Sequence, residues 1–281
     1  MILVTGITGQ LGFDVVKELE RRGESFIGTT RKEIDLSDPE SAKNFILEKK
    51  PDAVIHCAAY TAVDKAEEEA ELALTANGLA TRKIAEACRE VGAKMLYVST
   101  DYVFGGEGET PYEVSDEKAP QNIYGKSKLL GEDSVIAMVR NYFIVRISWV
   151  FGINGKNFVK TMLNFDKRRK KISVVDDQVG SPTYTADLAP LLVDMIKSEK
   201  YGIYHATNEG FCSWAEFAEE IFKQADREMT VEKIPTSDYP TPAKRPLNSR
   251  LSKKSLDDAG FKRLPTWQDA VKRFLAEVNK K

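Results

Sequence analysis

The stretch ILVTGITGQLG, residues 2–12, decides the fold of this chain of 281 residues. Its apolar and β-branched start is typical of a buried strand, and residues 9–23 continue in a helical pattern that ends at a glycine. Gly6, Gly9 and Gly12 occupy the loop between strand and helix. Such a loop lets the backbone approach a pyrophosphate, and the helix N-terminus favours the anion. Because strand, loop and helix occur together, the stretch predicts a dinucleotide site, with a purely structural turn as the alternative.

Short apolar runs alternate with longer amphipathic runs over the first half of the chain. This alternation is typical of repeated βαβ units and a parallel sheet. We therefore expect an α/β fold, a Rossmann-like doubly wound parallel sheet with a smaller C-terminal substrate-binding α/β domain. The expected strands cover 2–6, 25–30, 52–58, 94–99 and 143–148, and the expected helices cover 9–23, 38–50, 79–92 and a segment that begins near 124.

The pattern of the sequence changes after about residue 149. Helical patterns at 157–169, 187–198 and 213–225 are joined by loops rich in proline and threonine. An open α/β sheet binds ligands at the carboxyl ends of its strands, so we expect these segments to cover that edge. The expected boundaries are a dinucleotide-binding domain at 1–150 and a mainly substrate-binding domain at 151–281, with some segments returning to the core of the first.

The formal net charge is −2, which provides no overall basic field of the kind that nucleic-acid binding requires. The dense basic run KRRKK at 167–171 follows a helical pattern, where cations complement the helix C-terminus. Met1 leads directly into the first strand, and no apolar stretch has the length of a signal peptide or membrane span. We expect a cytoplasmic protein, monomeric or homodimeric, that binds neither nucleic acid nor membrane.

The cysteines and histidines are too few and too scattered for a metal site. Cys57, Cys88 and Cys212 form no Cys-x-x-Cys pair, and they are typical of small apolar residues in a reducing compartment. His56 and His205 are the only histidines, and they lie far apart in sequence. We predict no metal, and a histidine-based catalytic scheme is disfavoured.

The pentapeptide YGKSK places Tyr124 and Lys128 four residues apart, on one face of the expected helix. A phenol ordinarily titrates near ~10, and a neighbouring ammonium favours the phenolate and lowers that pKa. Tyr124 would then donate a proton efficiently near neutral pH. Thr100, at the end of the fourth strand, could bond the same carbonyl oxygen. A surface ion–dipole pair is the ordinary alternative.

The end of the second expected strand indicates which cofactor is bound. An acidic side chain there binds the ribose hydroxyls of NAD, whereas an arginine accommodates the 2′-phosphate of NADP. This chain has Thr29, Thr30 and Arg31 at that point and no acid before Glu33. We predict NADPH, with NADH possible.

The glycine loop and the Thr, Tyr, Lys trio together resemble the extended short-chain dehydrogenase/reductase superfamily. Within it the chain resembles the dTDP-4-dehydrorhamnose reductase family over nearly its whole length. That resemblance implies reduction of the C4 ketone of dTDP-4-dehydro-6-deoxy-L-mannose to dTDP-L-rhamnose by NAD(P)H, a step of cell-surface polysaccharide biosynthesis. The motifs that carry it are GQLG, AAYTAVDKAE, STDYVFGG, PQNIYGKSKLLGE, RISWVFG, NFVKTML, DDQVGSPTYTADLA and TPAKRPLNSRL.

The resemblance also implies roles for single residues. Tyr124 would protonate the C4 oxygen. Lys128 would lower the pKa of Tyr124 and hold the nicotinamide ribose, and Thr100 would complete the catalytic trio. Arg245 would contact the substrate diphosphate. Other implied cofactor contacts are Gly6, Gly9, Gln10, Leu11 and Gly12 near the pyrophosphate, Thr29 and Arg31 at the adenosine ribose, Asp35 and Leu36 at adenine, and Ala58, Ala59, Tyr60 and Thr61. Other implied substrate contacts are Val63, Asp101 and Trp149, and Thr100 would also touch the substrate.

Some relatives are magnesium-linked dimers held by glutamates, and Asp14 stands at the matching N-terminal position, which puts that interface in doubt. A 4,6-dehydratase would carry an Asp-Glu pair after the threonine, whereas this chain has Asp101 followed by Tyr102. An epimerase or another nucleotide-sugar 4-keto reductase shares the fold. A non-catalytic NADP-binding regulatory subunit is a further alternative, which need not keep an intact trio.

Overall fold

A computed structural model describes residues 1–166 and 170–279. Residues 167–169, part of the basic run noted above, lie outside the described residues. The centre of the molecule is a six-stranded sheet in the order β10-β5-β4-β3-β1-β2, with every neighbouring pair parallel. Its strands are β1 (Ile2–Thr5), β2 (Phe26–Thr29), β3 (Ala53–His56), β4 (Lys94–Thr100), β5 (Tyr142–Ile147) and β10 (Gly202–His205).

The strand order creates a crevice at the carboxyl edge of the sheet. From β1 the chain passes to β2 on one side, and β3 then lies on the other side of β1. The loops after β1 and β3 therefore diverge, and ligands of open α/β sheets bind at such a switch point. The predicted parallel sheet is confirmed.

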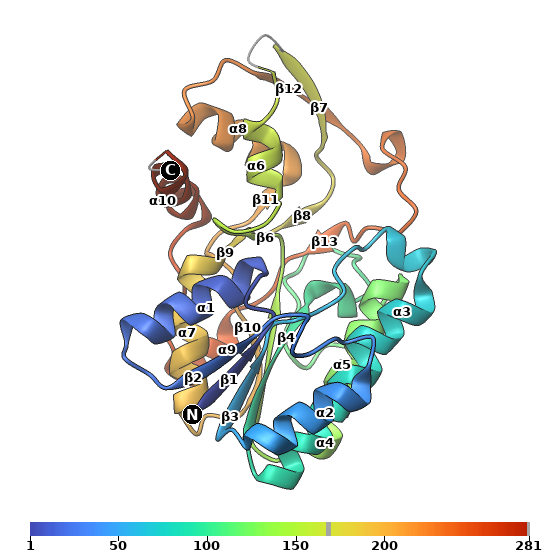
Figure 1. Cartoon of the computed structure of the whole chain (residues 1–281). Coiled ribbons are helices and arrows are strands. Elements are labelled where there is room, and N and C mark those ends of the chain that lie inside the picture. Colours follow the sequence, from blue (N-terminus) through green and yellow to red (C-terminus); the bar gives the residue numbers. More distant parts are fainter. Residues whose placement is uncertain (167–169, 280–281) are drawn as a thin grey trace.

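Helices cover both faces of this sheet (Figure 1). On one face α1 (Gln10–Arg21) packs against α7 (Thr185–Lys197), and on the other α4 (Ala80–Val91) packs between α2 (Pro39–Lys49) and α5 (Ile123–Met138). Each face has its own apolar core between helices and strands. Parallel strands covered on both faces need such near-continuous apolar runs.

Short helical pieces link the larger elements. Asp38 caps α2 by accepting a 3.1 Å hydrogen bond from the Ser41 amide, and Pro39 takes the first helical position. The short pieces are a 3₁₀ turn at Lys65–Glu67, α3 (Ala70–Leu74), a π turn at Thr75–Leu79 that runs into α4, 3₁₀ turns at Asp101–Val103 and Thr236–Asp238, and α9 (Lys254–Asp258).

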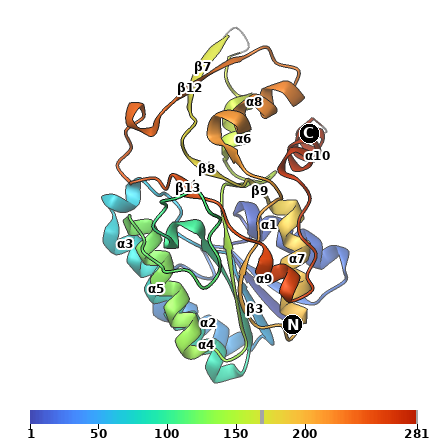
Figure 2. The same ribbon diagram turned by 180° about the vertical axis from the view of Figure 1, so that it is seen from behind.

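A smaller lobe lies over the carboxyl edge of the sheet (Figures 1 and 2). Its core is rich in aromatic residues, with Phe151, Phe217 and Phe274 fully buried. Short strands pair as β11-β8-β13, β12-β7 and β6-β9. The elements are β6 (Val150–Phe151), α6 (Phe158–Leu163), β7 (Lys171–Val175), β8 (Val179–Gly180), β9 (Thr183–Tyr184), β11 (Cys212–Ser213), α8 (Trp214–Gln224), β12 (Thr230–Ile234), β13 (Asn248–Ser249) and α10 (Trp267–Val278).

Parts of the second half of the chain return to the central sheet. β10 pairs with β5, and α7 packs on α1. The strand β10 was not predicted, because its sequence GIYH is short and carries two polar or flexible residues. The helix expected at 157–169 is shorter than the pattern indicated, since α6 ends at Leu163.

Candidate active site

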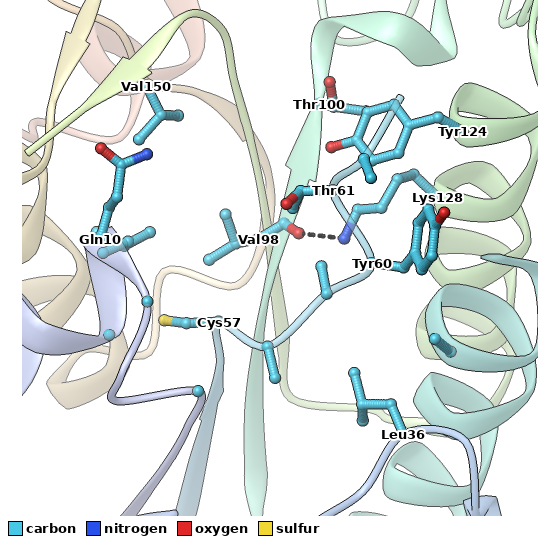
Figure 3. A pocket seen from close by; sticks show the side chains of 18 of the residues that line it. Gln10, Leu36, Cys57, Tyr60, Thr61, Val98, Thr100, Tyr124, Lys128 and Val150 are labelled. Atoms are coloured by element: carbon cyan, nitrogen blue, oxygen red, sulfur yellow. Dashed lines mark hydrogen bonds between the residues drawn. The ribbon is translucent and has the colours of Figure 1, made fainter. Parts of the chain in front are cut away.

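One cavity of about 890 Å³ lies at the carboxyl edge of the sheet, beneath the smaller lobe. It runs from the glycine loop after β1, past the loop after β3, to the end of β4 and the start of α5. Every residue expected at the cofactor or substrate site lines this cavity, except Thr29 and Arg245. Figure 3 shows part of this wall, with Gln10 on one side and Tyr124 and Lys128 on the other.

The glycine loop fits a pyrophosphate. Gly6 has a φ of +72°, and a Cβ there would lie 2.8 Å from the Ala58 Cα, so only glycine suits the position. A Cβ on Gly12 would lie 2.3 Å from the Gly6 carbonyl oxygen. No side chain caps the N-terminus of α1 at Gly9, and its first turn carries no acidic residue. Its amide groups and its dipole are therefore available to an anion.

The smaller lobe touches the glycine loop directly. Asn154 donates a 2.8 Å hydrogen bond to the Thr8 carbonyl oxygen, and Asn157 donates a 2.9 Å bond to the Gln10 side chain. Lys156, between these asparagines, lines the cavity. These residues were not among the sequence-derived candidates, because the contact joins segments more than 140 residues apart. The Asn-Gly turn at 154–155 was the only local signal.

The loop after β2 presents one arginine to the cavity. Arg31 is 80% exposed at its side chain and pairs with Asp35 through a 3.1 Å contact between Nε and Oδ2. Glu33 accepts bonds from the amide and hydroxyl of Thr30, which lower the pKa of its carboxyl group. Glu33, the first acid after β2, is thus engaged by Thr30.

Thr29 does not face the cavity. It is fully buried in β2, its hydroxyl donates to the Val4 carbonyl oxygen at 3.3 Å, and its own carbonyl oxygen accepts from the amides of Gly6 and Ile7. Thr30, the first residue after β2, lines the cavity instead. The expected contact of Thr29 with the adenosine ribose is therefore replaced by support of the glycine loop.

The loop after β3 is held in place by Asn77, which sits in the π turn before α4. Asn77 accepts from the Tyr60 amide at 2.8 Å and donates to the Tyr60 carbonyl oxygen and to the Ser127 hydroxyl, both at 2.9 Å. Asn77 was not predicted, although a buried asparagine inside a helical pattern is an available signal. It joins the loop after β3 to the helix that carries Tyr124.

Thr100, Tyr124 and Lys128 meet at the cavity wall, as expected from β4 and α5 (Figure 3). Asn122 caps α5 through a 2.8 Å bond from the Gly125 amide, which fixes the first turn that carries Tyr124. Burial raises the pKa of Tyr124, and a hydrogen bond with Thr100 only partly offsets this. The phenol therefore keeps its proton at neutral pH.

The expected pairing of Lys128 with Tyr124 is not present. Lys128 is 2% exposed, donates a 2.7 Å bond to the Val98 carbonyl oxygen and lies 4.0 Å from the centre of the Tyr97 ring. Burial lowers the pKa of Lys128 to about 7, and Glu132 opposes this shift. The expected lowering of the Tyr124 pKa by Lys128 is thus wrong for this arrangement, because burial dominates both groups.

A buried acid lies directly after β4, where the resemblance implies a substrate contact. Asp101 is 4% exposed and accepts bonds from the hydroxyls of Thr100 and Ser249. Burial raises the pKa of Asp101 to about 6, which these two bonds partly offset. Val63 and Trp149 line the same cavity.

Arg245 is engaged elsewhere in this structure. Arg245 itself does not line the cavity, and its guanidinium group donates to Asp64 at 2.6 Å and, at 3.0 Å, to the hydroxyl of Tyr102, which does line it. A contact with a substrate diphosphate stays a prediction. Asp14, the residue considered for a metal interface, is 4% exposed and accepts a hydrogen bond from Thr185. In the described ranges no group of three or more His, Cys, Asp or Glu side chains could hold a metal ion.

The model of the RmlD substrate-binding domain family matches residues 1–280. The chain belongs to this family. It is 39% identical to the spore coat polysaccharide biosynthesis protein SpsK of Bacillus subtilis, over 98% of this chain and 97% of SpsK. No helix in the part of the chain that the structure describes is long and apolar enough to cross a membrane.

Solved structures of family members superpose closely. The chain is similar to a dTDP-4-dehydrorhamnose reductase from Clostridium acetobutylicum, with a TM-score of 0.96, 41% identity and 99% of both chains covered. It is also similar to a dTDP-4-dehydrorhamnose reductase from Bacillus anthracis in complex with NADP, with a TM-score of 0.95, 42% identity and 98% of both chains covered. The Rossmann-like fold expected from the glycine loop is confirmed.

Proposed function

We propose that this chain reduces the C4 ketone of dTDP-4-dehydrorhamnose to dTDP-L-rhamnose, with NADPH as the reductant and NADH as a possible substitute. The observation that carries the proposal is the meeting of Thr100, Tyr124 and Lys128 in one cavity with the glycine loop. Relatives named for this reaction support it at 41% and 42% identity over nearly whole chains. A place in cell-surface polysaccharide synthesis agrees with the name of the Bacillus subtilis relative, a spore coat polysaccharide biosynthesis protein.

Bound NADPH supplies the hydride that the ketone carbon accepts. Tyr124 holds the proton that the C4 oxygen needs, because its raised pKa keeps the phenol protonated at neutral pH. Thr100 orients that oxygen through its hydroxyl group, and Lys128 positions the ribose next to the reacting carbon. Trp149, Val63 and Asp101 form the wall that the sugar contacts.

The cofactor residues that we propose follow the cavity from end to end. Gly9, Gln10 and Leu11 hold the pyrophosphate at the start of α1, Arg31 binds the 2′-phosphate, and Leu36 packs on adenine. The protein acts in the cytoplasm, where NADPH and nucleotide sugars are available, and it does so as a monomer or homodimer.

The decisive experiment measures NADPH oxidation by absorbance. dTDP-4-dehydrorhamnose is generated in place from dTDP-glucose by a dehydratase and an epimerase, and this protein is then added. Oxidation that requires both the protein and the epimerase is the expected result, and repeating it with NADH gives the cofactor preference. No oxidation by a protein that still binds NADPH would overturn the proposed reaction and favour a different keto-sugar or a regulatory subunit.

A dehydratase activity is disfavoured at one position. Where a dehydratase needs a second carboxylate after Asp101, this chain has Tyr102, whose hydroxyl accepts a 3.0 Å bond from Arg245. Burial raises the pKa of Tyr102 to about 12, and Arg245 opposes that rise, so its phenol cannot replace a carboxylate base at neutral pH.

A further inference from the structure

Trp149, at the substrate end of the cavity, stacks on a second tryptophan. Its ring centroid lies 3.8 Å from that of Trp214, with an angle of 16° between the ring planes. Both indoles are half-buried, but only Trp149 lines the cavity. Trp214 therefore stands behind the wall that we propose for the sugar and does not face the cavity itself.

The backbone of Trp149 is strained. Its φ is +49°, one of three positive values among the described residues other than glycine. A bulky side chain rarely adopts this left-handed conformation, and it persists only where the surroundings enforce it. Thr183 contributes to that restraint, since its amide donates to the Trp149 carbonyl oxygen at 3.1 Å and its hydroxyl donates to the Ser148 carbonyl oxygen at 2.6 Å.

Trp214 is itself firmly placed. It is the first residue of α8, directly after Ser213, whose hydroxyl accepts from the Glu216 amide while Glu216 bonds back to the Ser213 amide. The Phe158 ring packs on Trp214 with centroids 4.7 Å apart. The capped helix thus delivers a fixed aromatic surface to Trp149.

Gly180 allows a second close approach to the Trp149 indole. A Cβ at this position would lie 3.0 Å from Cε2 and 3.1 Å from Cζ2 of Trp149, and 2.9 Å from the Cβ of Ser249. Ser249 in turn donates a hydrogen bond to Asp101. Two features of the smaller lobe therefore determine where Trp149 and Ser249 can lie. They are the Trp214 ring and the absence of a side chain at Gly180.

The geometry points to Trp214 and Gly180 as positioning residues for sugar recognition, acting through Trp149. The inference rests on the proposed function, because it assigns Trp149 to the sugar of the nucleotide-sugar substrate. Trp214 supplies the stacking surface that stabilises the left-handed Trp149, and Gly180 leaves the room that its indole occupies. The smaller lobe then positions the Trp149 part of the sugar wall, whereas the reacting groups come from β4 and α5.

The test compares Trp214→Leu, Trp214→Phe and Gly180→Ala with the wild type. Leu at 214 should raise KM for the keto-sugar about two- to tenfold, the range that corresponds to an aromatic pair, with a smaller change in kcat. Phe should restore most of the loss, and Gly180→Ala should reproduce it by displacing the indole. The dissociation constant for NADPH should stay unchanged in all three variants.

Binding without turnover separates the sugar from the nucleotide. Trp214→Leu should weaken the binding of dTDP-L-rhamnose, measured by calorimetry, but should leave the binding of dTDP unaffected. Circular dichroism should show loss of the coupled signal of the stacked indoles in Trp214→Leu, and Trp267→Phe, a change in the same lobe away from the stack, should retain both signal and KM.

Equal weakening of dTDP and dTDP-L-rhamnose, or unchanged KM in both Trp214→Leu and Gly180→Ala, would overturn the inference. These outcomes are distinct from a failure of the proposed reaction, which would appear as absence of turnover in the wild type. A variant that lost NADPH binding as well would show a structural role only, and would equally overturn it.

Discussion

Lys128 donates a 2.7 Å hydrogen bond to the carbonyl oxygen of Val98, although Tyr124 lies one helical turn away. The bond fixes a buried ammonium group in the cavity wall, where burial lowers its pKa to about 7. Lys128 is therefore only partly charged at neutral pH in the absence of ligands, and Tyr124 keeps its proton without its help. Burial, more than direct pairing of the two side chains, therefore determines the protonation states of Tyr124 and Lys128.

The activity should depend on pH through Lys128. Its charged form prevails below about pH 7 and is lost as pH rises through that value, so kcat/KM for the ketone should fall on the alkaline side. A pH–rate profile of the wild type measures this limb. Lys128→Met should show low activity with no fall in kcat/KM near this pH. A fall that survives at the same pH in this variant would assign the titration to another group.

Tyr124→Phe removes the proton donor and keeps the ring. Turnover should fall by about 10²–10⁴-fold, the contribution of a general acid, because the variant has no phenol that can give its proton to the C4 oxygen. NADPH affinity, followed by the fluorescence of the bound cofactor, should change little. Near-normal turnover would remove Tyr124 from the mechanism.

Asp101→Asn should stabilise the protein at alkaline pH. The folded pKa of Asp101 is raised to about 6 from its usual 3.8, so its contribution favours folding at low pH and is lost as pH rises through about 6. The amide avoids the buried charge and should raise the free energy of unfolding at pH 8 by at most about 3 kcal/mol. Urea unfolding at pH 8 and pH 4 measures this.

The stability difference between Asp101→Asn and wild type should shrink toward pH 4, where the wild-type carboxyl is protonated in the folded state. Asp133→Asn, on the exposed side of α5, is the matched control and should leave both values unchanged. A constant difference at both pH values would show that the carboxylate charge is not the cause.

Arg146→Met should destabilise the fold by about 3–5 kcal/mol, because it leaves Glu132 charged and buried without its partner. Both side chains are fully buried, and the guanidinium group donates to the two carboxylate oxygens at 2.9 and 2.8 Å. Replacing both residues by apolar ones should recover part of the loss in urea unfolding. A double variant less stable than Arg146→Met alone would contradict this account.

Arg31→Ala should discriminate between the two cofactors. The side chain lines the cavity and can bind a 2′-phosphate, a charge-assisted contact whose loss should raise the NADPH dissociation constant about tenfold. NADH lacks that phosphate, so its affinity should change little. Lys32→Ala, one residue further and outside the cavity lining, serves as the control. Equal weakening of NADPH and NADH would place Arg31 elsewhere along the cofactor.

The sequence alone determined the features that depend on local pattern. Apolar runs alternating with amphipathic ones specified the parallel sheet, and the glycine spacing located the loop after its first strand. Both could be predicted because the periodicity of strands and helices depends on residues that are close in sequence. The resemblance to a family then pointed to half of the residues that line the cavity. Tyr124 and Lys128 were predicted to share a helix face, and they do.

Only the tertiary structure decided what those groups face. Lys128 bonds Val98, Arg245 bonds Asp64, and Trp149 stacks on Trp214, each across a separation in sequence that no local pattern records. Burial, which raises or lowers each pKa in the site, is likewise a property of the packed chain. Such contacts depend on how the smaller lobe folds over the carboxyl edge of the sheet, and the residues that bring it there lie far along the chain.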